Sequence, residues 1–241
     1  MPAQPPVRVA LVLVSHSRAL AEGAVELAAQ MAPRVTLLAA GGDGSGGLGT
    51  SFEAVESALM AATADGRSAV VLTDLGSAVL TTESVLDLLD DDVAGRVRIA
   101  DAPFVEGAVA AAVTADGGAD LAGVLASAVS AGSTFAASGP AAGADVAPAV
   151  GAPLAGDELV RTVTLRNRLG LHARPAASLA RLMAGFDAVV VVDGVNATSV
   201  LELMTLGATG GRKLEVRVSG PQRAEALAAL VEAVEGGFGE V

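Results

Sequence analysis

The sequence has no cysteine, no tryptophan, no tyrosine and only 2 histidines among its 241 residues. Without cysteine, the chain has no disulfide, no thiol nucleophile and no thiolate metal ligand. Two histidines do not make a ligand set either, so we expect no metal and no bound cofactor. No apolar run is long enough for a membrane-spanning helix, and the run that begins at Val9 is too short for a signal peptide. These absences predict a cytoplasmic protein.

Positive charge is also scarce, with 15 Lys and Arg against 27 Asp and Glu and a net charge of −12. This balance argues against binding to nucleic acid or to an anionic membrane surface, which need clustered cationic side chains. The excess of acidic residues is unevenly distributed: residues 1–135 carry 6 basic and 16 acidic residues, whereas residues 158–241 carry 9 of each. The two halves of the chain therefore have different surfaces.

Residues 136–157 separate these halves and are expected to form a linker. Ala, Gly and Pro fill 16 of the 22 positions, no apolar periodicity runs through them, and three prolines interrupt any helix. We therefore divide the chain into a first domain at 1–135, a linker at 136–157 and a second domain at 158–241.

The first domain alternates strand and helix patterns. Strands are expected at residues 7–14, 35–39, 68–73 and 97–100, and helices at residues 20–31, from 50, at 79–89 and between 105 and 130. This alternation predicts an α/β fold with an open, mostly parallel sheet and helices on both faces. The second domain follows the order βαββαβα, which predicts an α+β open-faced sandwich.

The first histidine, His16, directly follows the first expected strand, where ligands bind in open α/β sheets. Asp74 occupies the equivalent place after the third strand, which we expect to be a neighbour in the sheet. A carboxylate beside an imidazole fixes its tautomer and leaves the other ring nitrogen free as a nucleophile. Gly76 and Ser77 begin the next helix, where backbone N–H groups suit an anionic group.

The second histidine, His172, precedes an apolar pattern of helical spacing, with Pro175 in the expected first turn. His172 is therefore expected at or near the helix N-cap, where a phosphate on its ring would meet unpaired N–H groups and the positive end of the helix dipole. Arg174 is the natural guanidinium for the phosphate oxygens. A single histidine in a turn is more often a surface or capping residue, but both histidines of this chain fall at strand-to-helix junctions.

The glycine-rich loop at 44–49 formally matches the dinucleotide fingerprint G-x-G-x-x-G. It follows the second strand rather than the first, it lacks an acidic residue at the expected spacing, and no lysine makes it a Walker A loop. We interpret it as a loop near the active edge of the sheet rather than a nucleotide site.

The segment Gly-Leu-His-Ala-Arg-Pro-Ala at 170–176, the stretch at 195–200 and Leu206-Gly207 resemble HPr, the histidine phosphocarrier of the phosphoenolpyruvate-dependent phosphotransferase system. The resemblance implies that His172 accepts phosphate from enzyme I on its pros nitrogen, Nδ1, and that Arg174 stabilises it. Ser199 matches a position of regulatory phosphorylation in some relatives, although helix capping is its default interpretation.

The first domain resembles mannose-type enzyme IIA domains, through the segments at 12–17, 73–78 and 102–107. The sequence Leu-Gly-Ser-Ala after Asp74 favours the version found in the phosphotransfer subunit of dihydroxyacetone kinase. The resemblance implies that His16 is phosphorylated on its tele nitrogen, Nε2, that Asp74 orients it, and that the first domain forms a homodimer.

Together these resemblances imply a phosphotransferase, a subunit of a phosphoenolpyruvate–glycerone phosphotransferase. Phosphate would pass from phosphoenolpyruvate, the ultimate donor, through enzyme I to His172, then to His16, and finally to ADP on the nucleotide-binding subunit of dihydroxyacetone kinase. Two alternatives remain open at this point: a mannose-family sugar-transport component, and a regulatory module that signals through histidine phosphorylation.

Overall fold

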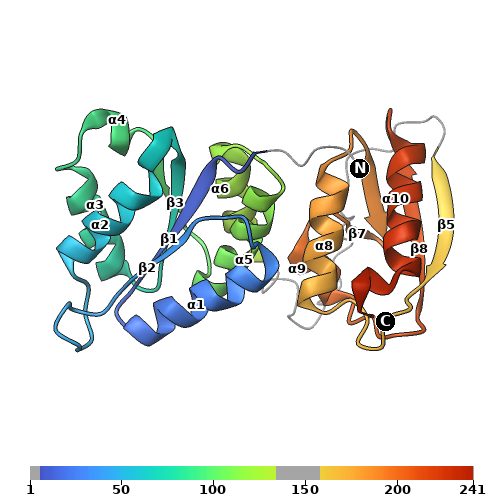
Figure 1. The fold of residues 1–241 in the computed structure, drawn as a ribbon, viewed down its shortest axis with the longest axis horizontal. Coiled ribbons are helices and arrows are strands. Elements are labelled where there is room, and N and C mark those ends of the chain that lie inside the picture. Colours follow the sequence, from blue (N-terminus) through green and yellow to red (C-terminus); the bar gives the residue numbers. More distant parts are fainter. Residues whose placement is uncertain (1–5, 134–157, 241) are drawn as a thin grey trace, which may run out of the picture.

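The computed structural model describes residues 6–133 and 158–240, which form a first and a second unit (Figure 1). The linker predicted at 136–157 lies outside the described residues. Within the described residues, no helix is both long and apolar enough to cross a membrane.

The first unit is built on a four-stranded, all-parallel sheet in the order β2-β1-β3-β4. Its strands are β1 (Val9–Ser15), β2 (Leu37–Gly41), β3 (Ser68–Thr73) and β4 (Val97–Ile99). Every residue of β1 is buried, because helices cover both of its faces. Val9, Leu11 and Leu13 face one apolar core, whereas Ala10, Val12 and Val14 face the other.

The helices of the first unit divide between those two faces, which confirms the predicted fold class. The helices are α1 (Arg18–Met31), α2 (Phe52–Ala62), α3 (Gly76–Leu86), α4 (Asp91–Ala94), α5 (Phe104–Asp116) and α6 (Leu121–Ser130), with a 3-10 turn, η1, at Ala64–Gly66. Buried residues of α1, α5 and α6 share one core, and those of α2 and α3 share the other.

Several bounds differ by about two residues from the sequence-based expectation, and three differences in the first unit are instructive. The strand expected at 35–39 lies at Leu37–Gly41, and the helix expected from 79 begins at Gly76. The apolar pattern could not locate that helix start, since its N-cap is Leu75, which makes no side-chain capping bond. The short helix α4 was not predicted, because four residues are too few to show a helical period.

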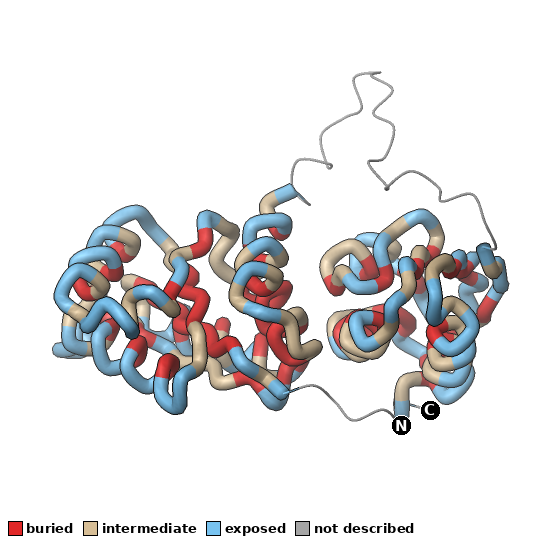
Figure 2. The backbone as a smooth tube through the Cα atoms, turned by 90° about the horizontal axis from the view of Figure 1, so that it is seen from above, coloured by how far each residue is buried: buried red, intermediate tan, exposed pale blue. Residues whose placement is uncertain are grey.

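The second unit is the predicted open-faced sandwich. Its antiparallel sheet has the order β5-β8-β6-β7. Its elements are β5 (Leu159–Thr164), α8 (Ala173–Ala184), β6 (Val189–Val192), β7 (Val195–Asn196), α9 (Val200–Thr205), β8 (Lys213–Ser219), α10 (Arg223–Glu235) and a 3-10 turn, η2, at Gly237–Gly239. Along β8, buried and exposed residues alternate, so the helices cover one face and leave the other to solvent (Figure 2).

The two units contact each other through helices. Figure 1 shows α1 and α5 of the first unit beside α8 and α9 of the second. Met31, Val109 and Val113 are 3%, 6% and 2% exposed, and they join the apolar core cluster of the second unit. The contact is therefore packed with apolar side chains.

Candidate active sites

His16 lies at the carboxyl edge of the parallel sheet, between the end of β1 and the N-cap of α1. Its position is fixed locally, since the hydroxyl of Ser17 caps α1 by accepting a hydrogen bond from the N–H of Leu20 at 3.3 Å. The strands β1 and β3 pair in register Val14↔Thr73. Asp74, one residue beyond β3, is therefore brought to the same edge, as predicted.

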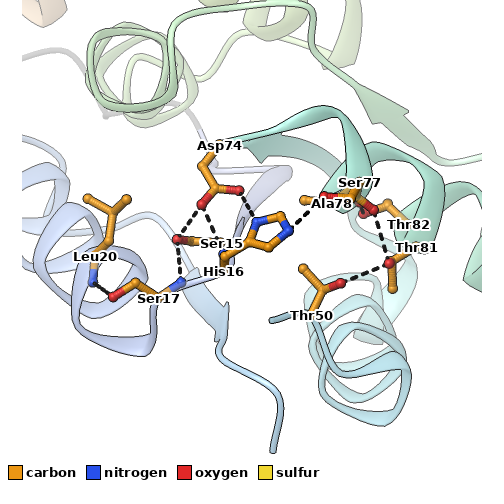
Figure 3. Close-up of polar contacts among 10 residues, drawn as sticks. All are labelled: Ser15, His16, Ser17, Leu20, Thr50, Asp74, Ser77, Ala78, Thr81 and Thr82. Atoms are coloured by element: carbon orange, nitrogen blue, oxygen red, sulfur yellow. Dashed lines mark hydrogen bonds and ion pairs between the residues drawn. The ribbon is translucent and has the colours of Figure 1, made fainter. Parts of the chain in front are cut away.

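Asp74 holds His16 by two hydrogen bonds (Figure 3). One carboxylate oxygen, Oδ1, lies 2.9 Å from the ring Nδ1 of His16, and Oδ2 accepts the backbone N–H of His16 at 2.9 Å. The hydroxyl of Ser15, a fully buried residue, donates to Oδ2 at 2.8 Å. An ionised carboxylate can only accept, so it selects the tautomer of neutral His16 that carries its proton on Nδ1.

The electrostatic balance at Asp74 favours its ionised form. Burial raises the pKa of Asp74, but hydrogen bonds from the ring and backbone of His16 and from Ser15 outweigh it, and the pKa lies below its usual value. The carboxylate is 12% exposed and the imidazole 25% exposed. An aspartate kept ionised at this place stabilises any positive charge that develops on the ring.

The other ring nitrogen of His16, Nε2, faces the start of α3. The hydroxyl of Ser77 lies 2.7 Å from Nε2 (Figure 3). Gly76 is the first residue of α3 and Ser77 the second. The first N–H groups of a helix have no intrahelical partner, so a phosphoryl group on Nε2 would meet both these N–H groups and the hydroxyl.

The glycine-rich loop also reaches this edge of the sheet. The N–H of Gly49 donates to the carbonyl of His16 at 2.9 Å. The carboxylate of Asp43 accepts the N–H groups of Ser45 and Gly47, both at 2.8 Å. Hydrogen bonds to Asp43 thus hold the loop together, and its bond to the carbonyl of His16 places it beside that residue.

His172 is the N-cap residue of α8, as the sequence predicts. The chain enters the helix through Gly170, whose positive φ of +71° favours glycine. A Cβ at Gly170 would lie 1.9 Å from the carbonyl oxygen of Ala208. The first turn of α8 contains Pro175, which needs no hydrogen-bond partner there.

Glu240 contacts the ring of His172, and the sequence alone did not suggest it. Oε2 of Glu240 lies 2.9 Å from Nε2 of His172 and 3.4 Å from Nδ2 of the buried Asn167. The hydrogen bond from His172 lowers the pKa of the Glu240 carboxyl. By the same reasoning as for Asp74, this carboxylate selects the tautomer of neutral His172 with its proton on Nε2, which leaves the lone pair of Nδ1 unprotonated.

Arg174 lies in the first turn of α8 beside His172, and it reaches the first unit. Its Nη2 donates to Oε1 of Gln30, in the last turn of α1, at 3.1 Å. Ser199 caps α9, with its hydroxyl accepting the N–H of Glu202 at 3.4 Å. Ser199 also lines a hollow of about 650 Å³ between the two units.

The structure thus pairs His16 with Asp74 and Ser77, and it places His172 beside Arg174 as a separate centre. Sequence reasoning missed Ser15 and Glu240: a serine beside the histidine carries no motif of its own, and Glu240 lies 68 residues from His172. Within the described ranges, no group of three or more His, Asp or Glu side chains could hold a metal ion.

Comparisons with known proteins match each unit to one family. Residues 10–125 match the EIIA-man family, described as "PTS system fructose IIA component". Residues 159–236 match the PTS-HPr family, described as "PTS HPr component phosphorylation site". The boundaries of these matches fall within the two predicted domains.

Individual relatives cover either the whole chain or one unit. "PEP-dependent dihydroxyacetone kinase, phosphoryl donor subunit DhaM" of Pantoea ananatis is 38% identical over 95% of this chain, which spans 50% of that relative's length. "Phosphocarrier protein NPr" of Escherichia coli is 45% identical over 33% of this chain and 94% of its own length. A solved structure, "unknown function protein EF1359", is 38% identical over 51% of this chain and 93% of its own, with a TM-score of 0.47.

Proposed function

Since this chain belongs to the EIIA-man and HPr families and is homologous to DhaM proteins over 95% of its length, we propose that it relays phosphoryl groups between its two histidines. Phosphate enters from phosphoenolpyruvate through enzyme I at His172, passes to His16, and leaves to ADP on the nucleotide-binding subunit of a dihydroxyacetone kinase. The chain spans about half the length of the DhaM relatives it matches.

The observation that carries this proposal is that a carboxylate contacts a different ring nitrogen in each of the two imidazoles. Asp74 is hydrogen-bonded to Nδ1 of His16, and Glu240 is hydrogen-bonded to Nε2 of His172. The nitrogen that is left to accept a phosphoryl group is therefore Nε2 in His16 and Nδ1 in His172. Each unprotonated nitrogen lies at the start of a helix, and Arg174 adds a guanidinium to the first turn of α8 after His172.

The transfer step balances without any further reactant. The lone pair on Nε2 of His16 attacks phosphorus, the P–Nδ1 bond of phosphorylated His172 breaks, and its electron pair returns to Nδ1. Asp74 holds the Nδ1 proton of His16 and stabilises the charge that develops as the new bond forms. The protein contributes position and electrostatics, as is usual for phosphoryl transfer.

The partners follow from the same proposal. Enzyme I delivers phosphate to the neutral second unit, where Arg166, Arg168 and Arg174 form a basic group around the HPr motif. The first unit delivers phosphate to the ADP-binding subunit and forms a homodimer. We also propose that the chain acts in the cytoplasm, as its sequence leads us to expect.

The test uses the full chain with phosphoenolpyruvate, enzyme I and the variants His172→Ala and His16→Ala. We expect no enzyme I-dependent label on His172→Ala, and label on His172 alone in His16→Ala. Label on His16 without His172 or any added HPr would contradict the order. A dihydroxyacetone kinase that lacks its donor subunit should regain activity with the wild-type chain, and failure there would favour the sugar-transport alternative.

A further inference from the structure

The contact between the two units is organised around a buried aspartate. Asp116, at the end of α5, is 2% exposed. Its carboxylate accepts a hydrogen bond from Nε of Arg34 at 2.9 Å and forms an ion pair with Nε of Arg181 at 3.1 Å. Arg34 belongs to the first unit, whereas Arg181 belongs to α8, so one carboxylate joins the units.

Further contacts surround this ion pair. Arg181 also donates to the carbonyl of Met31 at the end of α1. The approach of α8 to α5 is close, since a Cβ at Gly117 would lie 3.6 Å from the Cβ of Ala184. Burial lowers the pKa of Arg181, which Asp116 opposes. A buried carboxylate with two guanidinium partners is a specific contact, because removal of one partner leaves charge poorly compensated.

This contact holds the two histidines apart. His16 precedes the first turn of α1, whereas Arg174, two residues after His172, bonds to Gln30 in its last turn. Helix α1 has 14 residues and is therefore about 20 Å long. Figure 1 shows α1 running from the carboxyl edge of the sheet toward α8. Transfer needs the reacting atoms at about 3–3.5 Å.

We propose that the surface formed by the end of α1 and the end of α5, with Asp116, binds the chain's own second unit in the resting state. We call this surface the dock. In the docked position His172 cannot reach His16 of the same chain, and intramolecular transfer requires that Arg181 leave Asp116. The proposal rests on the relay proposed above. The 24 residues at 134–157 span up to about 80 Å when extended, enough for the second unit to reach His16 after release.

The test replaces Arg181, which bonds to Asp116 and to the carbonyl of Met31 in the first unit, by Ala and by Glu. The matched control is Arg217→Ala, because Arg217 bonds only to Glu215 and Glu158 of its own unit in the described contacts. The chain has no cysteine, so Leu88→Cys, 76% exposed, and Lys213→Cys on an exposed position of β8 accept a dye pair for distance measurement.

We expect one narrow distance distribution in the wild type and the control, and a broad one in Arg181→Glu. Single-turnover transfer from His172 to His16 within one chain should be about tenfold faster in Arg181→Ala, the scale of one lost charged hydrogen bond. Dyes that show no docked state in the wild type, or no release in Arg181→Glu, would overturn the dock. Release of the second unit with unchanged or slower phosphoryl transfer from His172 to His16 would show that the dock is not inhibitory.

A separate mixture distinguishes failure of this proposal from failure of the relay. Phosphorylated His16→Ala protein is mixed with His172→Ala protein, so that phosphate can reach His16 only between chains. Transfer there, with intramolecular rates that do not respond to Arg181, refutes the dock and keeps the relay. No transfer to His16 in any arrangement refutes the relay, and the dock falls with it.

Discussion

Each of the two histidines is oriented by a carboxylate, but the two stand on different scaffolds. His16 stands at the edge of a parallel sheet, and its carboxylate partner comes from the neighbouring strand end. His172 stands at the N-cap of α8 in the open-faced sandwich, and its partner, Glu240, directly follows the 3-10 turn η2. The difference decides which ring nitrogen of the neutral imidazole is unprotonated, Nε2 in the first case and Nδ1 in the second.

The two carboxylates are also held to different degrees. Asp74 is 12% exposed and takes part in three hydrogen bonds, with His16 and Ser15, whereas Glu240 is 26% exposed and takes part in two, with His172 and Asn167. A buried, multiply bonded carboxylate orients a ring more strictly than an exposed one, because solvent screens the exposed pair. We therefore expect His16 to depend on its partner more than His172 does.

The largest effect is expected for Asp74→Asn. Loss of the carboxylate that selects the tautomer should slow phosphorylation of His16 by about 10⁴-fold, the scale seen when a carboxylate that orients a catalytic histidine is lost. Labelling of His172 should stay unchanged in the same protein. The control is Asp43→Asn, in the loop beside His16, and an equal loss in both variants would show that Asp74 has no specific role.

The next effect concerns the loop that presents His172. Gly170→Ala should lower the free energy of unfolding of the second unit by about 3 kcal/mol, because the new Cβ would collide with the carbonyl of Ala208. Gly194→Ala is the matched control: its φ is also positive, but no atom lies within 4 Å of its Cβ. Denaturant titration measures both, and equal losses would mean that backbone strain alone explains the glycine.

A smaller effect is expected for Glu240→Gln, which keeps the shape but loses the charge. Phosphorylation of His172 by enzyme I should slow by about tenfold, because the variant loses one hydrogen bond to a charged group. Glu235→Gln, on the exposed face of α10, is the control. A loss as large as that of Asp74→Asn would contradict the expected difference between the two centres.

The smallest effect is a pH dependence of stability that comes from Asp74. Its pKa in the folded chain is below the ordinary value of 3.8, so its stabilisation is complete above that pH and is lost as pH falls through the folded value. The stability difference between wild type and Asp74→Asn should therefore shrink below pH 3.8. Urea titrations at neutral and acid pH measure it, and a constant difference would exclude this linkage.

The sequence predicted the fold class, the proximity of His16 to Asp74 and the place of His172 at the N-cap of α8, each for a physical reason. Apolar runs identify β1 and β3, and parallel neighbours end at one edge, which brings His16 to Asp74. The proline after His172 and the following apolar pattern locate the N-cap of α8. These signals are local or depend on a single strand pairing.

The remaining features depend on packing that no local pattern encodes. Glu240 reaches His172 only because the chain after α10 folds back through a turn with a positive φ at Phe238. Arg181 and Asp116 meet only when two separately folded units pack together. Charge counts showed that the units differ, but they could not pair one arginine with one aspartate.

The most direct measurement is nitrogen-15 and phosphorus-31 NMR of the chain phosphorylated by enzyme I and phosphoenolpyruvate. Variants His16→Ala and His172→Ala assign the signals, with the second variant phosphorylated by added HPr. The account predicts phosphorus bonded to Nδ1 of His172 and to Nε2 of His16. Phosphorus on the same nitrogen in both rings, or on Nε2 of His172, would contradict the assignment of each ring by its carboxylate.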